Sequence, residues 1–148
     1  MTKVLATAFL LTVPFIGGCG YKGVPVEFAN ACEASHDGKT LEVAGFLEPR
    51  SFILCSNTGG RMDCPFDFSE SIGSDKKIMA DIEQGSGRNT VSEIPKGFKK
   101  DDLKVRDNSG AEIALGVDKL RLTGKMLIAP AAPGGQGVCM MQVYKIER

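Results

Sequence analysis

The 148-residue sequence contains no tryptophan, one histidine and two tyrosines, and its acidic and basic residues are equal in number. The few aromatic residues are not interleaved with basic ones and the formal charge is zero, so the sequence lacks the usual features of a nucleic-acid binder. The five cysteines contain no Cys-x-x-Cys spacing, which argues against a zinc ribbon, a thioredoxin-like redox site and covalent haem. We therefore expect no nucleic-acid partner, no metal and no other cofactor.

Candidate catalytic residues are few. His36 is followed by Asp37 and Gly38, a combination more typical of an exposed turn than of an acid-base centre. Asp81 and Glu83 fall on one face of an expected strand, where paired carboxylates could serve hydrolysis or bind a cation. Ordinary alternation on an exposed strand explains them equally well. We predict that the protein is not an enzyme, and a hydrolase using Asp81 and Glu83 is the least favoured alternative.

The longest hydrophobic run lies near the N-terminus. Lys3 precedes residues 4–16, which are apolar except for threonines and Pro14, and two glycines follow. This is the layout of an export signal, and the run is shorter than the roughly 20 apolar residues that span a bilayer. A retained membrane anchor is the alternative.

The four residues Ile16-Gly17-Gly18-Cys19 resemble the lipobox of bacterial lipoproteins. The resemblance implies that residues 1–18 are removed as a signal peptide and that Cys19 becomes an acylated first residue, with 19–26 as a lipidated tether. Buried acyl chains contribute about 0.8 kcal/mol per methylene, so the implied partner is a membrane. Gly20 after the cysteine resembles the outer-membrane class rather than the inner-membrane class, with the domain facing the periplasm. The alternative is an ordinary secretory signal cut near Gly18, with Cys19 left as a thiol.

Assigning Cys19 to lipid leaves an even set of cysteines, Cys32, Cys55, Cys64 and Cys139, which suits an oxidising compartment. Three pairings are possible. We favour Cys55 with Cys64, because these two flank a turn-rich segment, and hence Cys32 with Cys139. The second bridge would close a loop of about 100 residues and stabilise the fold by roughly 4 to 5 kcal/mol in the chain-entropy model. Free buried cysteines are the alternative.

The rest of the chain is predicted to be one mainly β domain over residues 27–148. Residues 27–35 are expected to form a short helix with Phe28, Ala31 and Cys32 on one face. Alternation of apolar residues predicts strands at 41–47, 51–55, 77–83, 120–128 and 139–147, and a hairpin over 103–115. In the strand at 120–128, Leu120, Leu122, Met126 and Ile128 should point inward and Arg121, Thr123 and Lys125 outward.

The segments Val-Ala-Gly-Phe-Leu (43–47) and Leu-Thr-Gly-Lys-Met (122–126) resemble the first and fourth strands of the OB-fold, and residues 139–147 its fifth. The resemblance implies a small antiparallel OB-like β-barrel whose ligand lies on strands two and three and on the loops at 48–50 and 129–137. An eight-stranded barrel or a two-sheet sandwich is the alternative.

A candidate binding surface surrounds the segment Cys-Pro-Phe-Asp-Phe. If exposed, Phe66 and Phe68 would form a contact patch with Arg50, Phe52 and Arg61. If buried, the two phenylalanines would close one end of the barrel, and this interpretation is favoured.

The function predicted from these features is that of a membrane-anchored periplasmic lipoprotein. It would act as a non-catalytic binding or interaction module for an envelope protein or a small ligand. The alternative is a structural or assembly accessory of the cell envelope. The predicted mature start Cys-Gly-Tyr-Lys-Gly is similar to that of a very small lipoprotein associated with lipopolysaccharide export.

Overall fold

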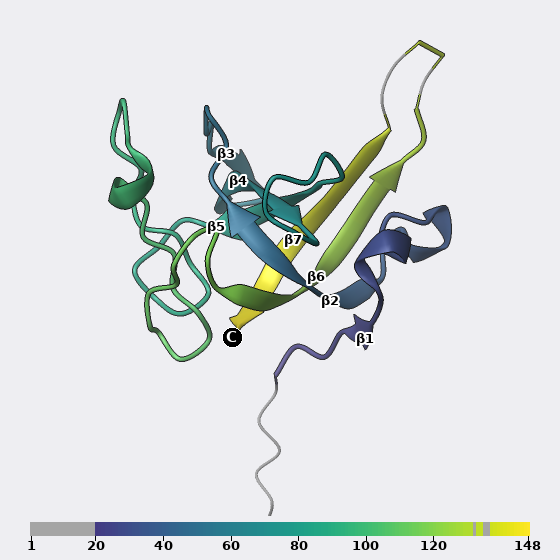
Figure 1. Ribbon diagram of the computed structural model, residues 1–148, viewed down its shortest axis with the longest axis horizontal. Coiled ribbons are helices and arrows are strands. Elements are labelled where there is room, and N and C mark those ends of the chain that lie inside the picture. Colours follow the sequence, from purple (N-terminus) through teal and green to yellow (C-terminus); the bar gives the residue numbers. More distant parts are fainter. Residues whose placement is uncertain (1–19, 132, 135–136) are drawn as a thin grey trace, which may run out of the picture.

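A computed structural model of the chain describes residues 20–131, 133–134 and 137–148. The predicted signal peptide and Cys19 lie outside these residues. The described chain is mainly β (Figure 1) and consists of β1 Val24–Pro25, η1 Phe28–Asn30, η2 Ala34–His36, β2 Thr40–Glu48, β3 Ser56–Thr58, β4 Arg61–Ser69, β5 Ile78–Glu83, η3 Lys100–Asp102, β6 Lys119–Ala129 and β7 Val138–Glu147. Within the described ranges, no helix is both long enough and apolar enough to cross a bilayer.

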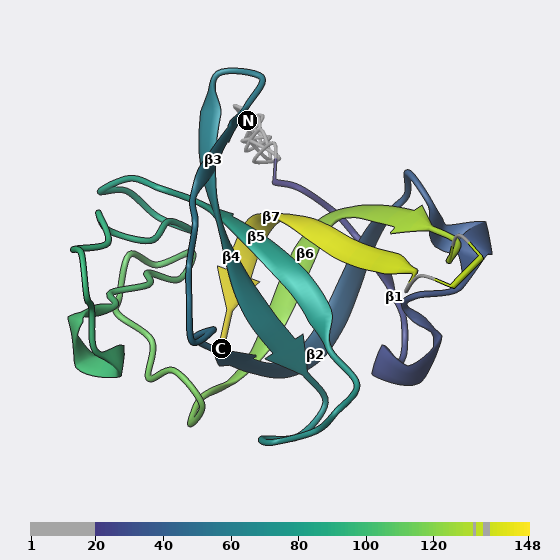
Figure 2. The same ribbon diagram turned by 90° about the horizontal axis from the view of Figure 1, so that it is seen from above.

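The strands form a single sheet in the order β1-β2-β6-β7-β5-β4-β3, and not the two sheets of a sandwich. The pairs β1–β2 and β5–β7 are parallel, and the remaining pairs are antiparallel. The long strand β2 pairs with β6 through residues 40–46 and also with β4 through residues 46–48. Figure 2 shows the strong bend of the sheet that these two pairings require.

Two glycines permit this bend. A Cβ atom at Gly45 would lie 2.9 Å from the ring of Phe68 and closer still to the backbone oxygen of Ser69. At Gly45, β2 therefore makes a close contact with β4. A Cβ at Gly124 would collide with the backbone oxygen of Gln142, at the point where the β6–β7 register shifts.

The core follows the predicted alternation, with one exception. Leu120, Leu122 and Met126 are buried, and Ile128 is half-buried. Thr123, predicted to point outward, is buried as well. The register shift between Thr123 and Gly124 interrupts the regular alternation of β6, which explains the difference.

The predicted helix at 27–35 is not formed. Its residues make two separate 3₁₀ turns, η1 and η2, with hydrogen bonds between residues three apart. Glu33, between the turns, has an extended backbone with ψ 138°. A helix this short is marginal without packing, and these turns are held by the core and by a disulfide instead.

Two further predictions are wrong in detail. Residues 51–55 belong to no strand, because they are held by the buried side chain of Ile53 and the disulfide of Cys55 rather than by a ladder. The region 103–115 contains isolated bridges, such as Arg106 with Glu112, in place of a regular hairpin. Within this region the amide of Gly110 donates to the carbonyl of Asp107 and closes a turn.

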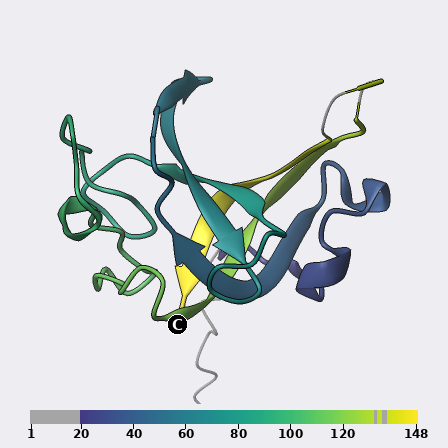
Figure 3. The same cartoon turned by 45° about the horizontal axis from the view of Figure 1, so that its top comes forward.

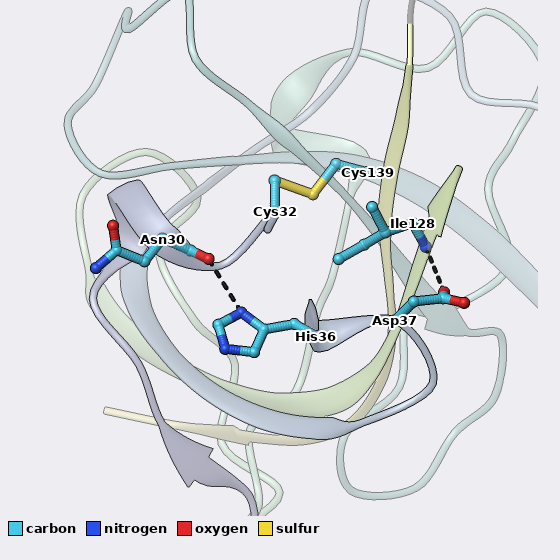
Figure 4. The surroundings of a disulfide bond; sticks show 6 residues. All are labelled: Asn30, Cys32, His36, Asp37, Ile128 and Cys139. Atoms are coloured by element: carbon cyan, nitrogen blue, oxygen red, sulfur yellow. Dashed lines mark hydrogen bonds between the residues drawn. A yellow bond between two sulfur atoms is a disulfide. The ribbon is translucent and has the colours of Figure 1, made fainter. Parts of the chain in front are cut away.

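Both predicted disulfides are present. Cys32 is bonded to Cys139 and joins the 3₁₀ region to β7, as Figure 4 shows. Cys55 is bonded to Cys64 at the base of the β3–β4 hairpin. Two disulfides indicate an oxidising, non-cytoplasmic compartment.

Candidate functional site

The candidate site is an apolar groove of about 630 Å³ between residues 51–55 and residues 93–98. Its lining residues are Ser51, Phe52, Ile53, Leu54, Cys55, Met62, Gln84, Glu93, Ile94, Pro95, Lys96, Gly97 and Phe98. Figures 1 and 3 show β3 and the 93–98 loop at the end of the molecule opposite the N-terminal segment. The groove therefore lies at the far end of the domain from the start of the described chain.

One wall of the groove is built by the segment that leads into β3. Ile53 is buried in the core, and Cys55 is covalently fixed to β4. Because side chains of an extended segment alternate, Phe52 and Leu54 point away from the core, with 71% and 68% of their surface exposed. Met62 of β4 is also exposed beside them. The segment thus presents apolar side chains to solvent on a rigidly held backbone.

The opposite wall is a loop. Ile94 and Phe98 pack partly against the core, and Gly97 has a φ of +67°, which turns the chain between them. Just before this loop, the amide of Ser92 donates to the carbonyl of Lys104 and ties the loop to the segment that follows η3. Glu93 and Lys96 supply one charge of each sign at the groove.

A hollow of this size and lining suits an apolar ligand or side chain. Binding pockets in proteins are largely lined by hydrophobic residues, with a few polar groups that set orientation. Here Gln84, Glu93 and Lys96 are the polar groups available. The groove is therefore chemically suited to recognition.

The predicted surface around Phe66 and Phe68 is not formed, because both rings are completely buried. They belong to the inward face of β4, and the ring of Phe68 lies 5.8 Å from that of Phe28. The favoured interpretation of the sequence, that these rings are buried, is confirmed. Of the five residues proposed for that surface, only Phe52 lines the groove.

The two arginines of that surface are bound to carboxylates. Arg50 lies 3.6 Å from Asp67, which also accepts a hydrogen bond from Lys77. This bond and the charge of Asp67 raise the pKa of Lys77 above 10.5. Arg61 pairs with Asp63 and donates to the carbonyl of Val143 in β7 at 2.8 Å. Arg61 therefore connects β4 to β7.

Asp81 and Glu83 lie, as predicted, on the outward face of β5. Burial raises the pKa of Asp81 above its usual 3.8, and the negative charge of Asp63 adds to the effect. Glu83 is half exposed, with its carboxylate 3.9 Å from Arg61. Neither residue lines the groove. Within the described part of the chain, no group of three or more histidine, cysteine or acidic residues is arranged to hold a metal ion.

His36 and Asp37 make local structural contacts (Figure 4). The Nδ1 atom of His36 donates to the carbonyl of Asn30 at 3.0 Å. The carboxylate of Asp37 accepts a hydrogen bond from the amide of Ile128 at 2.8 Å. The first contact joins η2 to η1, and the second fastens the end of η2 to β6, next to the Cys32–Cys139 disulfide.

Sequence reasoning missed the other apolar residues of the groove. Leu54 could have been found, because Phe52 and Leu54 flank Ile53 and alternation places them on the opposite face. Ile94 and Phe98 carried no such signal, since they lie in a long connection with no regular period.

Comparison of the chain with protein-family models, with curated proteins and with solved structures found no match in any of the three.

Proposed function

We propose that the protein is a lipid-anchored periplasmic binding module built on an OB-type barrel. The strand pairings support the barrel. The order β2-β6-β7-β5-β4 returns to β2 through the additional β2–β4 pairing, and β5 and β7 pair in parallel. In this arrangement β2, β4, β5, β6 and β7 are the five strands of a small Greek-key barrel.

The proposed anchor is a lipidated Cys19 in the bacterial envelope, with the outer membrane favoured. Its support is the lipobox-like sequence Ile16-Gly17-Gly18-Cys19 together with the two disulfides, which are typical of an oxidising compartment. Acyl chains on Cys19 would hold the domain at the membrane surface.

The observation that carries the binding function is the exposure of Phe52 and Leu54 over the groove. These residues lie in the connection from β2 to β4, which corresponds to a ligand-binding loop of OB-folds. Large apolar side chains that are exposed on a fixed backbone beside a hollow are typical of interaction sites.

The test is photo-crosslinking in intact cells with p-benzoylphenylalanine in place of Phe52. We expect a discrete adduct in the membrane fraction, which gel mobility and intact mass assign to an envelope protein or a small ligand. Leu54→Ser in the same chain should weaken the adduct several-fold, because it removes apolar surface from the groove.

Ile72 provides the matched control. Its side chain is also exposed and apolar but does not line the groove, so the crosslinker at position 72 should give no adduct. Cys19→Ser should move the protein out of the membrane fraction. Equal adducts from positions 52 and 72, or none from position 52, would contradict a binding role for the groove.

A further inference from the structure

The N-terminal segment is part of the folded domain rather than a free tether. Strand β1 pairs in parallel with β2, with Val24 opposite Leu41. A Cβ atom on Gly23 would lie 2.5 Å from the carbonyl carbon of Leu41, so only glycine allows this close approach. The segment is therefore fastened to the sheet from Gly23 onward.

A second contact lies closer to the start of the described chain. The ring of Tyr21 stacks on that of Tyr144 in β7, with the centroids 4.7 Å apart and the planes at 29°. Tyr144 is flanked by the guanidinium of Arg61, 5.9 Å from its ring centre. We call residues 20–26, with these two contacts, the N-terminal clasp.

The clasp leaves apolar and basic groups facing outward. Tyr21 and Val24 remain 61% and 60% exposed, and Lys22 between them is exposed as well. Tyrosine is enriched where membranes meet water, because its ring is apolar and its hydroxyl polar. Lysine near such a surface is attracted to anionic lipid headgroups.

We propose that the outer surface of the N-terminal clasp, formed by Tyr21, Lys22 and Val24, lies on the bilayer and holds the domain in one orientation. The inference rests on the lipidation of Cys19 proposed above. One residue, Gly20, separates Cys19 from Tyr21, so the Cα atom of the lipidated residue lies within about 7 Å of the Cα atom of Tyr21. At that distance the bilayer is the surface that Tyr21 and Val24 meet.

This orientation determines what the groove faces. The N-terminal segment and the groove lie at opposite ends of the molecule (Figures 1 and 3). With the clasp on the bilayer, the segment that carries Phe52 and Leu54 lies on the side of the domain away from the membrane that holds the protein. The groove is then open to a partner in the periplasm and not to lipid.

The natural absence of tryptophan makes the test direct, since an introduced tryptophan is the only one in the chain. The lipidated protein carrying Tyr21→Trp or Phe52→Trp is reconstituted into phosphatidylethanolamine and phosphatidylglycerol vesicles with brominated acyl chains. We expect Tyr21→Trp to be quenched at least about threefold more than Phe52→Trp, because bromine quenches only nearby indole rings in the bilayer. Equal quenching, or stronger quenching of Phe52→Trp, would overturn the proposal.

Val24→Trp places a second probe in the clasp without altering the Tyr21–Tyr144 stack, and it should also be quenched more than Phe52→Trp. Flotation of the vesicles separates the two proposals. A protein that does not float lacks the anchor, which contradicts the proposed function. A protein that floats while its probes at positions 24 and 52 are quenched equally contradicts the orientation alone.

Discussion

The side chain of Asp107 holds together the turn at residues 107–111, which precedes β6 and β7 in the chain. One carboxylate oxygen accepts hydrogen bonds from the amide and hydroxyl of Ser109 and from the amide of Ala111. The other accepts a hydrogen bond from Arg148 at 2.9 Å. Burial alone would raise the pKa of Asp107, but the hydrogen bonds from Ser109, Arg148 and Ala111 lower it below its usual 3.8.

This lowered pKa predicts a specific acid dependence. A carboxyl whose pKa is lower in the folded than in the unfolded protein stabilises the fold above the unfolded value, and the contribution is lost as pH falls through the folded value. We expect Asp107→Asn to lower the free energy of unfolding by about 1 to 2 kcal/mol near pH 7 and by less near pH 3. Urea denaturation at the two pH values measures both effects.

Asp75 is the control for this substitution, since it is exposed in a loop and its change to Asn should leave the stability nearly unchanged. An equal loss for Asp107→Asn at neutral and acid pH would show that the ionised carboxylate is not the stabilising form.

At the scale of the elements, β2 is the strand that joins the two ends of the bent sheet. It pairs with β1, β6 and β4, and Gly45 lies where β2 meets β4. A side chain at this position would enter the space between Ser69 and the buried ring of Phe68.

Gly45→Ala should therefore destabilise the fold by about 1 to 3 kcal/mol, the usual cost of overpacking a core. Gly87→Ala is the matched control, because no atom lies within 4 Å of the added methyl group there. Chemical denaturation of the two variants gives the comparison, and a similar midpoint for both would show that β2 and β4 can separate without loss.

The elements that could be predicted are those in which apolar residues alternate over most of the strand, namely β2, β5, β6 and β7. Strand β4 was missed because Pro65 lies in its middle, and proline normally argues against a strand. Residues 51–55 alternate as a strand would, yet they are fixed by Ile53 and Cys55. A local pattern shows which side chains are buried but not whether a neighbouring backbone is free to pair.

For the whole molecule, the two disulfides constrain loops of very different length. Cys32–Cys139 joins residues 107 apart, and it ties the turns at the beginning of the domain to the last strand. Cys55–Cys64 joins residues only nine apart. The longer loop restricts the unfolded chain much more.

We therefore predict that Cys32→Ser with Cys139→Ser lowers the free energy of unfolding by about 4 to 5 kcal/mol, against about 2 to 3 kcal/mol for Cys55→Ser with Cys64→Ser. Equilibrium urea denaturation of both double variants beside the parent measures the difference. A larger loss from the short bridge would mean that local packing, rather than loop length, dominates.

The site also shows the limit of sequence reasoning at this scale. Phe52 was recognised as a candidate contact residue, but its groove forms only when residues 93–98 fold back beside residues 51–55. The sequence of residues 93–98 has no periodic pattern that would predict their position beside residues 51–55. For Phe66 and Phe68 the sequence favoured burial but left exposure as an alternative, and their place on the inward face of β4 settles the matter.

The two edge strands of the sheet, β1 and β3, affect how molecules that lie side by side can associate. β1 is two residues long and includes Pro25, whereas β3 is three residues long and fully solvated. Edge strands that are short or contain proline present few unpaired backbone groups with which another copy could extend the sheet. Even when many copies lie close together on a surface, we therefore expect the protein not to assemble into fibres.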